Sequence, residues 1–255
     1  MEQVESMEQV CEFLEWDSQF FGIRIARVHG NSLDQQRVAA IDSWCQTASL
    51  DCLYFLSRCD DALTTRLAEE RGFHWVDVRI SLILDRLDPA HEQEVHAPGS
   101  AVPIRLATGT DIAALREIAR RSYSHSRFYY DEHFPRDLCG EFYAVWIEKC
   151  CHGHANAVLV AEIQGSPVGY VTCRLGHDEK IGQIDLVAVI EAAAGRGVGF
   201  SLLNAAKRWF SAHGATQVVV VTQGRNIGAQ RLYQRSGFVT NRVELWYHRW
   251  FSHGS

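Results

Sequence analysis

The chain has 255 residues, of which 47% are hydrophobic and 22% are charged, and its formal net charge is −6 at pH 7. This composition is typical of a globular protein with one large domain or two modest ones. The charge balance argues against a nucleic-acid partner, and no cluster of Lys or Arg indicates contact with a membrane surface.

The start of the chain and its cysteines bear on the cellular compartment. Residues 1–13 are acidic and lack an apolar core, so we expect no secretory signal. Apolar runs such as residues 218–221 are too short to cross a bilayer. The chain has 8 cysteines, and without export to an oxidising compartment we expect free thiols. These observations predict a cytoplasmic protein.

Strand patterns and helix patterns alternate in the N-terminal part of the chain. Alternating apolar residues predict strands, and helical spacing behind a capping residue predicts helices. The elements predicted here are strands at residues 21–28, 52–57 and 76–85, a helix at residues 32–45 capped by Ser32, and a helix from Asp61 to about Arg71. Residues 89–103 are polar, contain Pro98 and Gly99, and predict a linker.

The C-terminal part continues the alternation, with a β-hairpin turn at residues 164–167. Its predicted strands are residues 104–107, 158–163, 168–174, 184–189, 218–222 and 243–250. Its predicted helices are residues 112–121, 142–151, 197–213 and 227–236. Strands followed by helices, with hairpins between, predict a mixed α/β sheet. We predict an N-terminal α/β domain over residues 1–98 and a second domain over residues 99–255.

One stretch of the sequence is echoed elsewhere in the chain. Residues 66–73 and 231–238 both read as a helix end, a glycine and a phenylalanine, and each follows an apolar strand. The echo favours an old duplication and chance recurrence equally. In a duplication, Ala68 would occupy the position of Tyr233, and the N-terminal copy would lack a glycine loop.

A glycine-rich stretch lies between a predicted strand and a predicted helix. Gly195, Gly197 and Gly199 remove side chains where a ligand can approach the backbone, and the N–H groups of a helix N-terminus favour an anion such as pyrophosphate. No Lys-Ser/Thr pair follows, so this is not a Walker loop, and a dinucleotide fold would place its glycines near the start of a βαβ series. A glycine-rich helix start without a ligand is the alternative.

A second segment follows the next apolar strand. Asn226 and Tyr233 are seven residues apart, so about two helical turns place them on one face. Asn226 is also a natural N-cap. Taken alone, the two residues could be a cap and a core tyrosine.

Together the two segments resemble the GNAT superfamily of acyl-CoA N-acyltransferases. The run Arg196-Gly-Val-Gly is similar to the family's CoA-pyrophosphate loop, and the second segment is similar to the second motif at Asn226, Ala229, Leu232, Tyr233, Gly237 and Phe238. The resemblance covers about residues 103–250 and implies a GNAT fold for that part of the chain and acetyl-CoA as co-substrate. If the echo reflects a duplication, the N-terminal domain would be a degenerate GNAT-like half. The loop departs from the family at Ala194, where Gln or Arg is usual. The residues implied to bind the cofactor are Val187, Ala188, Val189, Gly195, Arg196, Gly197, Val198, Gly199, Phe200, Ser201, Asn226 and Ala229.

Acetyl transfer requires a neutral amine, a donor to the carbonyl oxygen, a proton for the leaving thiolate and aligned reactants. The resemblance implies Tyr233 as general acid, and a phenol can protonate a departing thiolate. It also implies that the backbone N–H of Val187 or Val189 polarises the thioester. Asp185 is the candidate base because it alternates onto the face of these two valines, although that face could equally be a solvated edge. Weaker candidates for the base are His125 and His177.

Residues 150–154 read Cys-Cys-His-Gly-His and contain metal-ligating side chains. Adjacent cysteines seldom supply tetrahedral zinc geometry, so we expect a helix end there and no metal.

A narrower resemblance concerns the acceptor. Residues 14–22, 126–128 and 142–147 are similar to segments of dTDP-fucosamine acetyltransferases, which acetylate the 4-amino group of a dTDP-linked 4-amino-4,6-dideoxy sugar for surface polysaccharide. Those enzymes share the Ala-Gly-Arg-Gly form of the loop. The resemblance implies a nucleotide-linked amino sugar as substrate, and a homodimer is compatible with it. The candidate substrate-binding residues, which offer aromatic faces and charge for a diphosphate, are Ser126, Arg127, Phe128, Tyr129 and Tyr130, with Arg136 as a second cation.

Other interpretations stay open. Residues 122–136 could be a packed connecting loop. The acceptor could be another nucleotide amino sugar or a small amine such as an antibiotic or a polyamine, although a polyamine would require an acidic cleft. The chain could also be a non-catalytic CoA-binding module, against which the presence of Tyr233 argues.

Overall fold

The computed structural model describes residues 10–87, 102–177 and 180–252. The chain divides into two compact units, Met1–Arg79 with Val243–Ser255, and Ile80–Arg242. The boundary falls within β4 (His74–Leu84) and β11 (Val239–Trp250), so each of these long strands contributes residues to both units. This division differs from the predicted boundary after residue 98, because a strand pattern does not reveal which sheet the strand joins. Most of the linker predicted at residues 89–103 lies outside the described residues.

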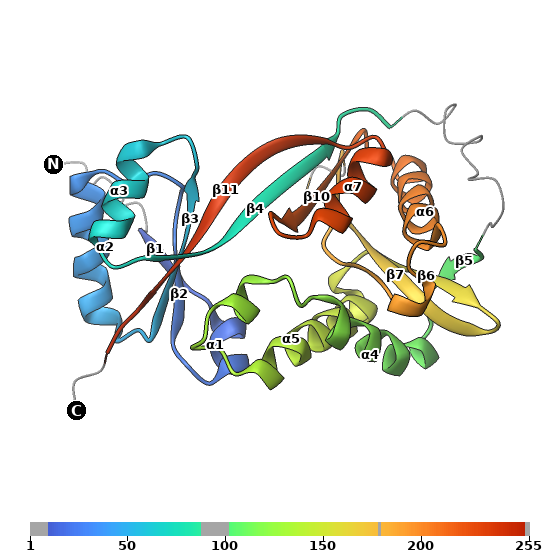
Figure 1. Cartoon of the computed structure of the whole chain (residues 1–255), viewed down its shortest axis with the longest axis horizontal. Coiled ribbons are helices and arrows are strands. Elements are labelled where there is room, and N and C mark those ends of the chain that lie inside the picture. The colour runs from blue at the N-terminus through green and yellow to red at the C-terminus, as the bar shows by residue number, and fades with distance from the viewer. Residues whose placement is uncertain (1–9, 88–101, 178–179, 253–255) are drawn as a thin grey trace, which may run out of the picture. The chain divides into compact units, whose positions relative to one another are not determined.

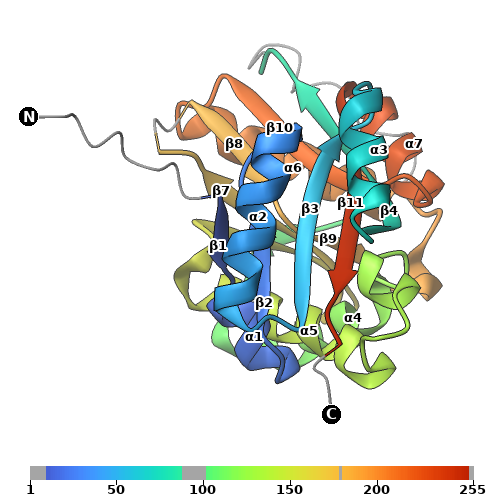
Figure 2. The ribbon, with the colours of Figure 1, turned by 90° about the vertical axis from the view of Figure 1, so that its left-hand side faces the viewer.

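The first unit is a sheet with two of its helices packed together on one face. Its strands are β1 (Cys11–Phe13), β2 (Ile25–Val28), β3 (Cys52–Arg58) and part of β11. β2 pairs parallel with β3, whereas β1 with β2 and β3 with β11 are antiparallel. Its helices are α1 (Glu15–Phe21), α2 (Gln35–Ala48) and α3 (Ala62–Glu70). Side chains of α2 and α3 share one apolar core with β3, and Figure 2 shows both helices over the same face.

Two predictions for this unit are wrong in detail. The strand predicted at residues 21–28 begins only at Ile25, because the residues before Gly22 form α1, which ends where Gly22 adopts a left-handed conformation with φ 70°. The cap predicted at Ser32 lies at Asp34, whose carboxylate accepts a hydrogen bond from the backbone N–H of Arg37 at 2.7 Å. The cap predicted at Asp61 is confirmed, since its carboxylate accepts from two backbone N–H groups at the start of α3.

The second unit is a mixed sheet with helices on both faces. Its strand order is β4-β10-β8-β7-β6-β5, and β9 pairs with β7. The bounds are β5 (Ile104–Leu106), β6 (Ala157–Ile163), β7 (Ser166–Leu175), β8 (Ile181–Ile184), β9 (Val187–Val189) and β10 (Gln217–Gln223). The helices are α4 (Ile112–Ser122), α5 (Arg136–Lys149), α6 (Val198–Ala212) and α7 (Ile227–Arg235). In Figure 1, α6 lies on one side of the strands and α4 and α5 lie on the other. The predicted mixed α/β fold is confirmed.

The single strand predicted at residues 184–189 is two strands separated by a bulge. Arg174 pairs with Gln183 and Val171 pairs with Val187, so three steps along β7 match four steps along β8 and β9. The extra residue breaks the alternation of side chains. The hydroxyl of Thr172 accepts a hydrogen bond from the backbone N–H of Leu186 at 2.9 Å and so satisfies a donor within the bulge.

The hairpin turn between β6 and β7 is confirmed. Ile163 pairs with Ser166, so the loop has two residues, Gln164 and Gly165, and both have positive φ, 51° and 76°. Two such residues form the tight turn whose twist matches that of antiparallel strands.

The echoed segments at residues 66–73 and 231–238 have the same local structure. Phe73 N–H donates to the carbonyl of Ala68, and Phe238 N–H donates to that of Tyr233, each at 3.0 Å. The glycine before each phenylalanine has positive φ, and both phenylalanines are buried. This is one helix-ending motif used twice.

Among the residues described, no helix combines the length and apolar character that a membrane crossing requires.

Candidate active site

The parallel pairing of β8 with β10 stops at the end of β8 and is not continued by β9. The last paired residues are Ile184 and Val220, and β9, which continues the chain, pairs with β7 instead. The edge of β9 opposite β7 is therefore directed toward the C-terminal end of β10. We call this place the strand opening.

Backbone groups of β9 face the strand opening in alternation. Ile190 N–H donates to Val168, and the carbonyl of Leu186 accepts from Thr172 N–H, both at 2.9 Å. Because alternate residues of a strand use opposite edges, the N–H groups of Val187 and Val189 point away from β7. This is the orientation that polarisation of a thioester carbonyl requires. The role predicted for these two N–H groups stays a prediction.

The glycine loop connects β9 to α6. Gly195 and Gly197 have φ of 74° and 78°, and Gly197 immediately precedes the first residue of α6. A side chain at either position would be strained, because L-residues rarely adopt this conformation. The loop thus leaves the N-terminal N–H groups of a 15-residue helix uncovered by an N-cap side chain, which is the arrangement that favours a bound phosphate. Arg196 is exposed between the two glycines.

Several predicted cofactor residues also have packing roles. Gly199 allows α6 and α7 to approach closely, because a Cβ there would lie 2.9 Å from Cδ2 of Leu232. Val198 and Ala188 are buried, so only their backbone groups are available to a ligand. Phe200 and Ser201 lie in the first turn of α6 and are partly buried.

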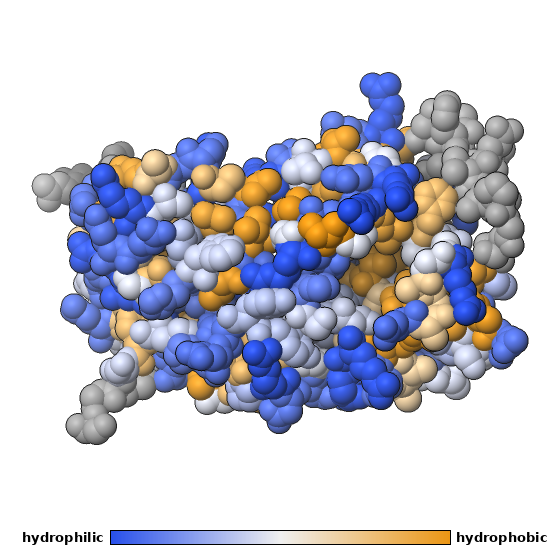
Figure 3. Space-filling model, viewed as in Figure 1, coloured by the Kyte–Doolittle hydropathy of each residue, from blue (hydrophilic) through white to orange (hydrophobic). Residues whose placement is uncertain are grey.

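Apolar side chains from the two sides of the strand opening pack on one core. Those that remain partly exposed there are Val187, Val189, Ile190, Ala229 and Leu232. Figure 3 shows apolar atoms in a hollow beside α6. Such a surface suits the aliphatic part of a pantetheine arm.

Asn226 caps the start of α7, and Tyr233 lies in the last turn of this helix. The side chain of Asn226 accepts a hydrogen bond from the backbone N–H of Ala229 at 3.1 Å, so the predicted N-cap is confirmed. Tyr233 is 5% exposed, and burial raises the pKa of its phenol well above the usual value. The phenol therefore carries its proton at neutral pH, as a general acid must.

Asp185 lies within the bulge and is paired with an arginine. Its carboxylate accepts two hydrogen bonds from Arg174, at 2.8 and 2.9 Å, and its side chain is 6% exposed. The interaction raises the pKa of Arg174. The bulge removes the alternation with Val187 and Val189 from which a basic role was predicted. The role of Asp185 as a base stays a prediction. Its two hydrogen bonds to Arg174 give it a structural role.

The predicted substrate segment forms a short 3₁₀ helix, Arg127–Tyr130, after Ser126. Phe128 is 1% exposed and its ring contacts those of Phe134 and Phe142, so its ring is not a surface for a ligand. Tyr130 is 55% exposed, and the guanidinium of Arg225 lies 3.5 Å from its ring centroid. Arg225 directly precedes Asn226, so this contact connects the segment to the start of α7.

The remaining residues of this segment face inward to different degrees. Ser126 is buried, and its hydroxyl has no hydrogen-bond partner in the described structure. Arg127 covers the ring of Phe128 at 4.4 Å from the centroid. Tyr129 is partly buried beside Arg136, whose guanidinium lies 6.0 Å from its ring centroid. Contact of these residues with a substrate stays a prediction.

Two tyrosines that sequence reasoning missed lie close to these elements. The hydroxyls of Tyr123, at the end of α4, and Tyr170, in β7, are 3.0 Å apart. Helix α4, which directly precedes Tyr123, also packs against β9, whose outer edge faces the strand opening. Their sequence separation gives no local pattern, so only the pairing of β7 with β9 could have indicated them.

Residues 150–154 form a wide helical turn after α5. Within the described residues no group of His, Cys, Asp and Glu side chains has the geometry of a metal site. Residues 150–153 instead line one side of a pocket of about 360 Å³ with the β5–α4 connection. This pocket involves none of the residues of the strand opening.

The chain is similar to a protein family, to characterised proteins and to solved structures. The model of the "Acetyltransferase (GNAT) family" matches residues 112–238. The dTDP-fucosamine acetyltransferase of Escherichia coli O6:H1 is 30% identical over 252 residues, which cover 93% of this chain and 97% of that protein. The spore coat polysaccharide biosynthesis protein SpsD of Bacillus subtilis is 33% identical over 140 residues, 55% of this chain and 48% of that protein, so the chain spans about half the length of SpsD.

A solved structure agrees in fold. The GCN5-related N-acetyltransferase from Sphaerobacter thermophilus has a TM-score of 0.64 at 17% identity, over 96% of this chain and 77% of that chain. The glycine loop and the segment that carries Asn226 and Tyr233 are the features from which membership was predicted. Together with the 30% identity along nearly the whole chain, they establish that the protein belongs to the GNAT family of acetyl-CoA-dependent N-acetyltransferases.

Proposed function

We propose that the protein transfers the acetyl group of acetyl-CoA to the 4-amino group of a dTDP-linked 4-amino-4,6-dideoxy sugar for the synthesis of a surface polysaccharide. The observation that carries the proposal is similarity to a dTDP-fucosamine acetyltransferase over 97% of that protein's length. Similarity to a spore coat polysaccharide biosynthesis protein supports the same class of pathway.

The proposed reaction uses the strand opening. The pyrophosphate of acetyl-CoA binds the loop of Gly195, Arg196 and Gly197, and the pantetheine arm follows β9. The acceptor nitrogen attacks the thioester carbonyl carbon, and the N–H of Val187 or Val189 donates to the carbonyl oxygen as it gains charge. The carbon–sulfur bond then breaks, and Tyr233 gives its proton to the thiolate. The cationic nitrogen loses a proton to a base, for which Asp185 is a candidate only if its pair with Arg174 opens.

The nucleotide part of the substrate is proposed to bind the segment of residues 126–130 through Arg127 and Tyr130, and not through the buried ring of Phe128. Tyr130 offers an exposed ring, and Arg127 and Arg225 supply positive charge near it. Planar guanidinium groups suit the oxygens of a diphosphate. We further propose that the protein is cytoplasmic and that it forms a homodimer. Light scattering of the purified protein would test the homodimer.

The decisive experiment measures binding and turnover with a panel of acceptors. Acetyl-CoA should raise the melting temperature, and a dTDP-linked 4-amino sugar should then give CoA release, followed as free thiol. A UDP-linked amino sugar, an aminoglycoside and a polyamine are the comparison acceptors. Turnover with the UDP sugar and none with the dTDP sugar would refute the proposed acceptor, and binding of acetyl-CoA without turnover on any amine would favour a CoA-binding module.

A further inference from the structure

Two phenols are hydrogen-bonded to each other beside β9. Tyr170 is fully buried in β7, its backbone is paired with Ala188 of β9, and its hydroxyl lies 3.0 Å from that of Tyr123. Tyr123 keeps part of its surface exposed. Burial raises the pKa of both phenols well above the usual value, so both are neutral at physiological pH. Neither can act as a base, but each can donate and accept a hydrogen bond.

The position of Tyr123 is fixed by the packing of α4 against α5. The ring of Tyr143 stacks on that of Tyr123 with centroids 4.3 Å apart. Gly140 lets the helices approach, because a Cβ there would lie 2.7 Å from the backbone oxygen of Arg120. The hydroxyl of Tyr123 is therefore held in place from two sides, by α5 and by Tyr170.

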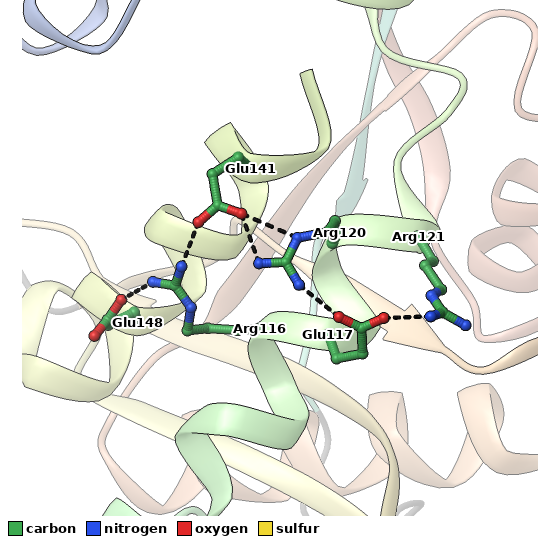
Figure 4. A network of polar contacts seen from close by, with 6 residues as sticks. All are labelled: Arg116, Glu117, Arg120, Arg121, Glu141 and Glu148. Carbon is green, nitrogen blue, oxygen red and sulfur yellow. Dashed lines mark hydrogen bonds and ion pairs between the residues drawn. The ribbon is translucent and has the colours of Figure 1, made fainter. Parts of the chain in front are cut away.

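An ion-pair network joins the outer faces of the same two helices. Arg116 contacts Glu141 and Glu148, and Arg120 contacts Glu141 (Figure 4). The network adds to the packing that holds α4 against α5, and Tyr123 directly follows α4. Individual exposed pairs contribute little, but several charges that share partners act together.

The chemistry of the reaction needs hydrogen-bonding groups at two places. Tyr233 belongs to the core on the α6 side of the sheet and is proposed to serve the leaving sulfur. The attacking nitrogen must be held as well, and its lone pair must stay free. A hydroxyl that accepts a hydrogen bond from the amine N–H meets this need, whereas one that donates to the nitrogen would occupy the lone pair.

We propose that Tyr123 accepts a hydrogen bond from the attacking amino group, and that Tyr170 positions it by accepting a hydrogen bond from the Tyr123 hydroxyl. With its own proton directed to Tyr170, the Tyr123 oxygen presents lone pairs to the amine. Tyr123 is then a substrate-contacting residue and Tyr170 a positioning residue. This inference rests on acetyl transfer from the proposed function, but not on the identity of the sugar.

The test is a double-mutant cycle with Tyr123→Phe and Tyr170→Phe, measured with whichever amine gives the highest wild-type turnover. Each substitution should lower kcat/KM for the amine by about tenfold, the effect of one lost hydrogen bond. The KM for acetyl-CoA should not change. The double variant should be no slower than Tyr123→Phe, because both residues act through one contact. Tyr247→Phe, at a buried tyrosine of the first unit, is the control and should retain wild-type rates.

The outcomes separate this inference from the proposed acceptor. Losses that multiply in the double variant, a raised KM for acetyl-CoA, or an unchanged kcat/KM in Tyr123→Phe would each overturn the inference. If Tyr170→Phe fails to fold, Tyr123→Phe alone decides. A wild type that prefers an amine other than the dTDP sugar, with the expected cycle, would refute the acceptor and support the inference. A wild type without turnover on any amine would overturn both.

Discussion

Tyr233 is held in its protonated form by burial. Because its pKa is raised above the usual value near 10, the acidic form persists throughout the range in which the enzyme can be assayed. We expect kcat to show no descending limb from Tyr233 as pH rises to about 10.

Tyr233→Phe should lower kcat by about 10²–10⁴-fold, the range for a lost general acid, with little change in the KM for acetyl-CoA. Steady-state kinetics across pH check both expectations, and an unchanged kcat would refute the acid role.

Asp185 could act as the catalytic base or could stabilise the fold through its ion pair with Arg174, and one substitution distinguishes the two roles. Asp185→Asn removes one charge of its pair with Arg174, so we expect a loss of about 1–3 kcal/mol in the free energy of unfolding, reduced from the full cost because the arginine is partly exposed. Denaturant titration measures it. Arg174→Met is the matched variant and should destabilise similarly. If Asp185→Asn instead lowers kcat a hundredfold while stability is unchanged, the carboxylate is the base.

The residues of the candidate site divide according to the information that reveals them. Gly197, Asn226 and Tyr233 lie in contiguous motifs, so local pattern and family resemblance were sufficient to predict them. Tyr123 and Tyr170 are separated by 47 residues, and nothing local indicates that their hydroxyls meet. The role of Phe128 was misjudged because an aromatic residue in a polar stretch has the same appearance in sequence whether its ring faces solvent or the core.

At the scale of elements, the contact between α6 and α7 depends on one glycine. Gly199→Ala would place a Cβ 2.9 Å from Leu232, so we expect overpacking to cost about 1–3 kcal/mol in the free energy of unfolding. Adding Leu232→Ala should recover part of that loss. Gly109→Ala is the control, since a Cβ there meets nothing within 4 Å. Thermal melting of the wild type, the two single variants, the double variant and the control checks the expectation. Additive effects of Gly199→Ala and Leu232→Ala would contradict it.

Most helices and strands of the second unit were predictable because hydrophobic spacing and caps are local. The bulge between β8 and β9 was not, because it depends on how three steps along β7 match four steps along the neighbouring segment. The first strand and helix of the first unit were also missed. They are three and seven residues long, too short for a periodicity to emerge.

At the scale of the whole molecule, the first unit is not a contiguous piece of the chain. Glu244–Trp250 of β11 pairs with Arg58–Cys52 of β3. A fragment of residues 1–98 lacks this strand and leaves the edge of β3 open, so we expect it to be unfolded or aggregated. The same fragment with residues 243–252 joined by a flexible linker should give a dispersed amide spectrum and a cooperative melt. A folded 1–98 fragment would show that β11 is dispensable and would support the predicted boundary.

The late position of β11 in the chain also orders events during synthesis. A ribosome makes the first residues of β3 almost two hundred residues before the strand that completes their sheet. The second unit, whose residues 80–242 are continuous, can fold while translation proceeds, whereas the first must wait. Nascent chains in which residue 242 but not residue 250 has left the ribosomal tunnel should therefore contain a protease-resistant acetyltransferase domain and a protease-sensitive N-terminal region. The N-terminal region should become resistant only after residue 250 has also emerged.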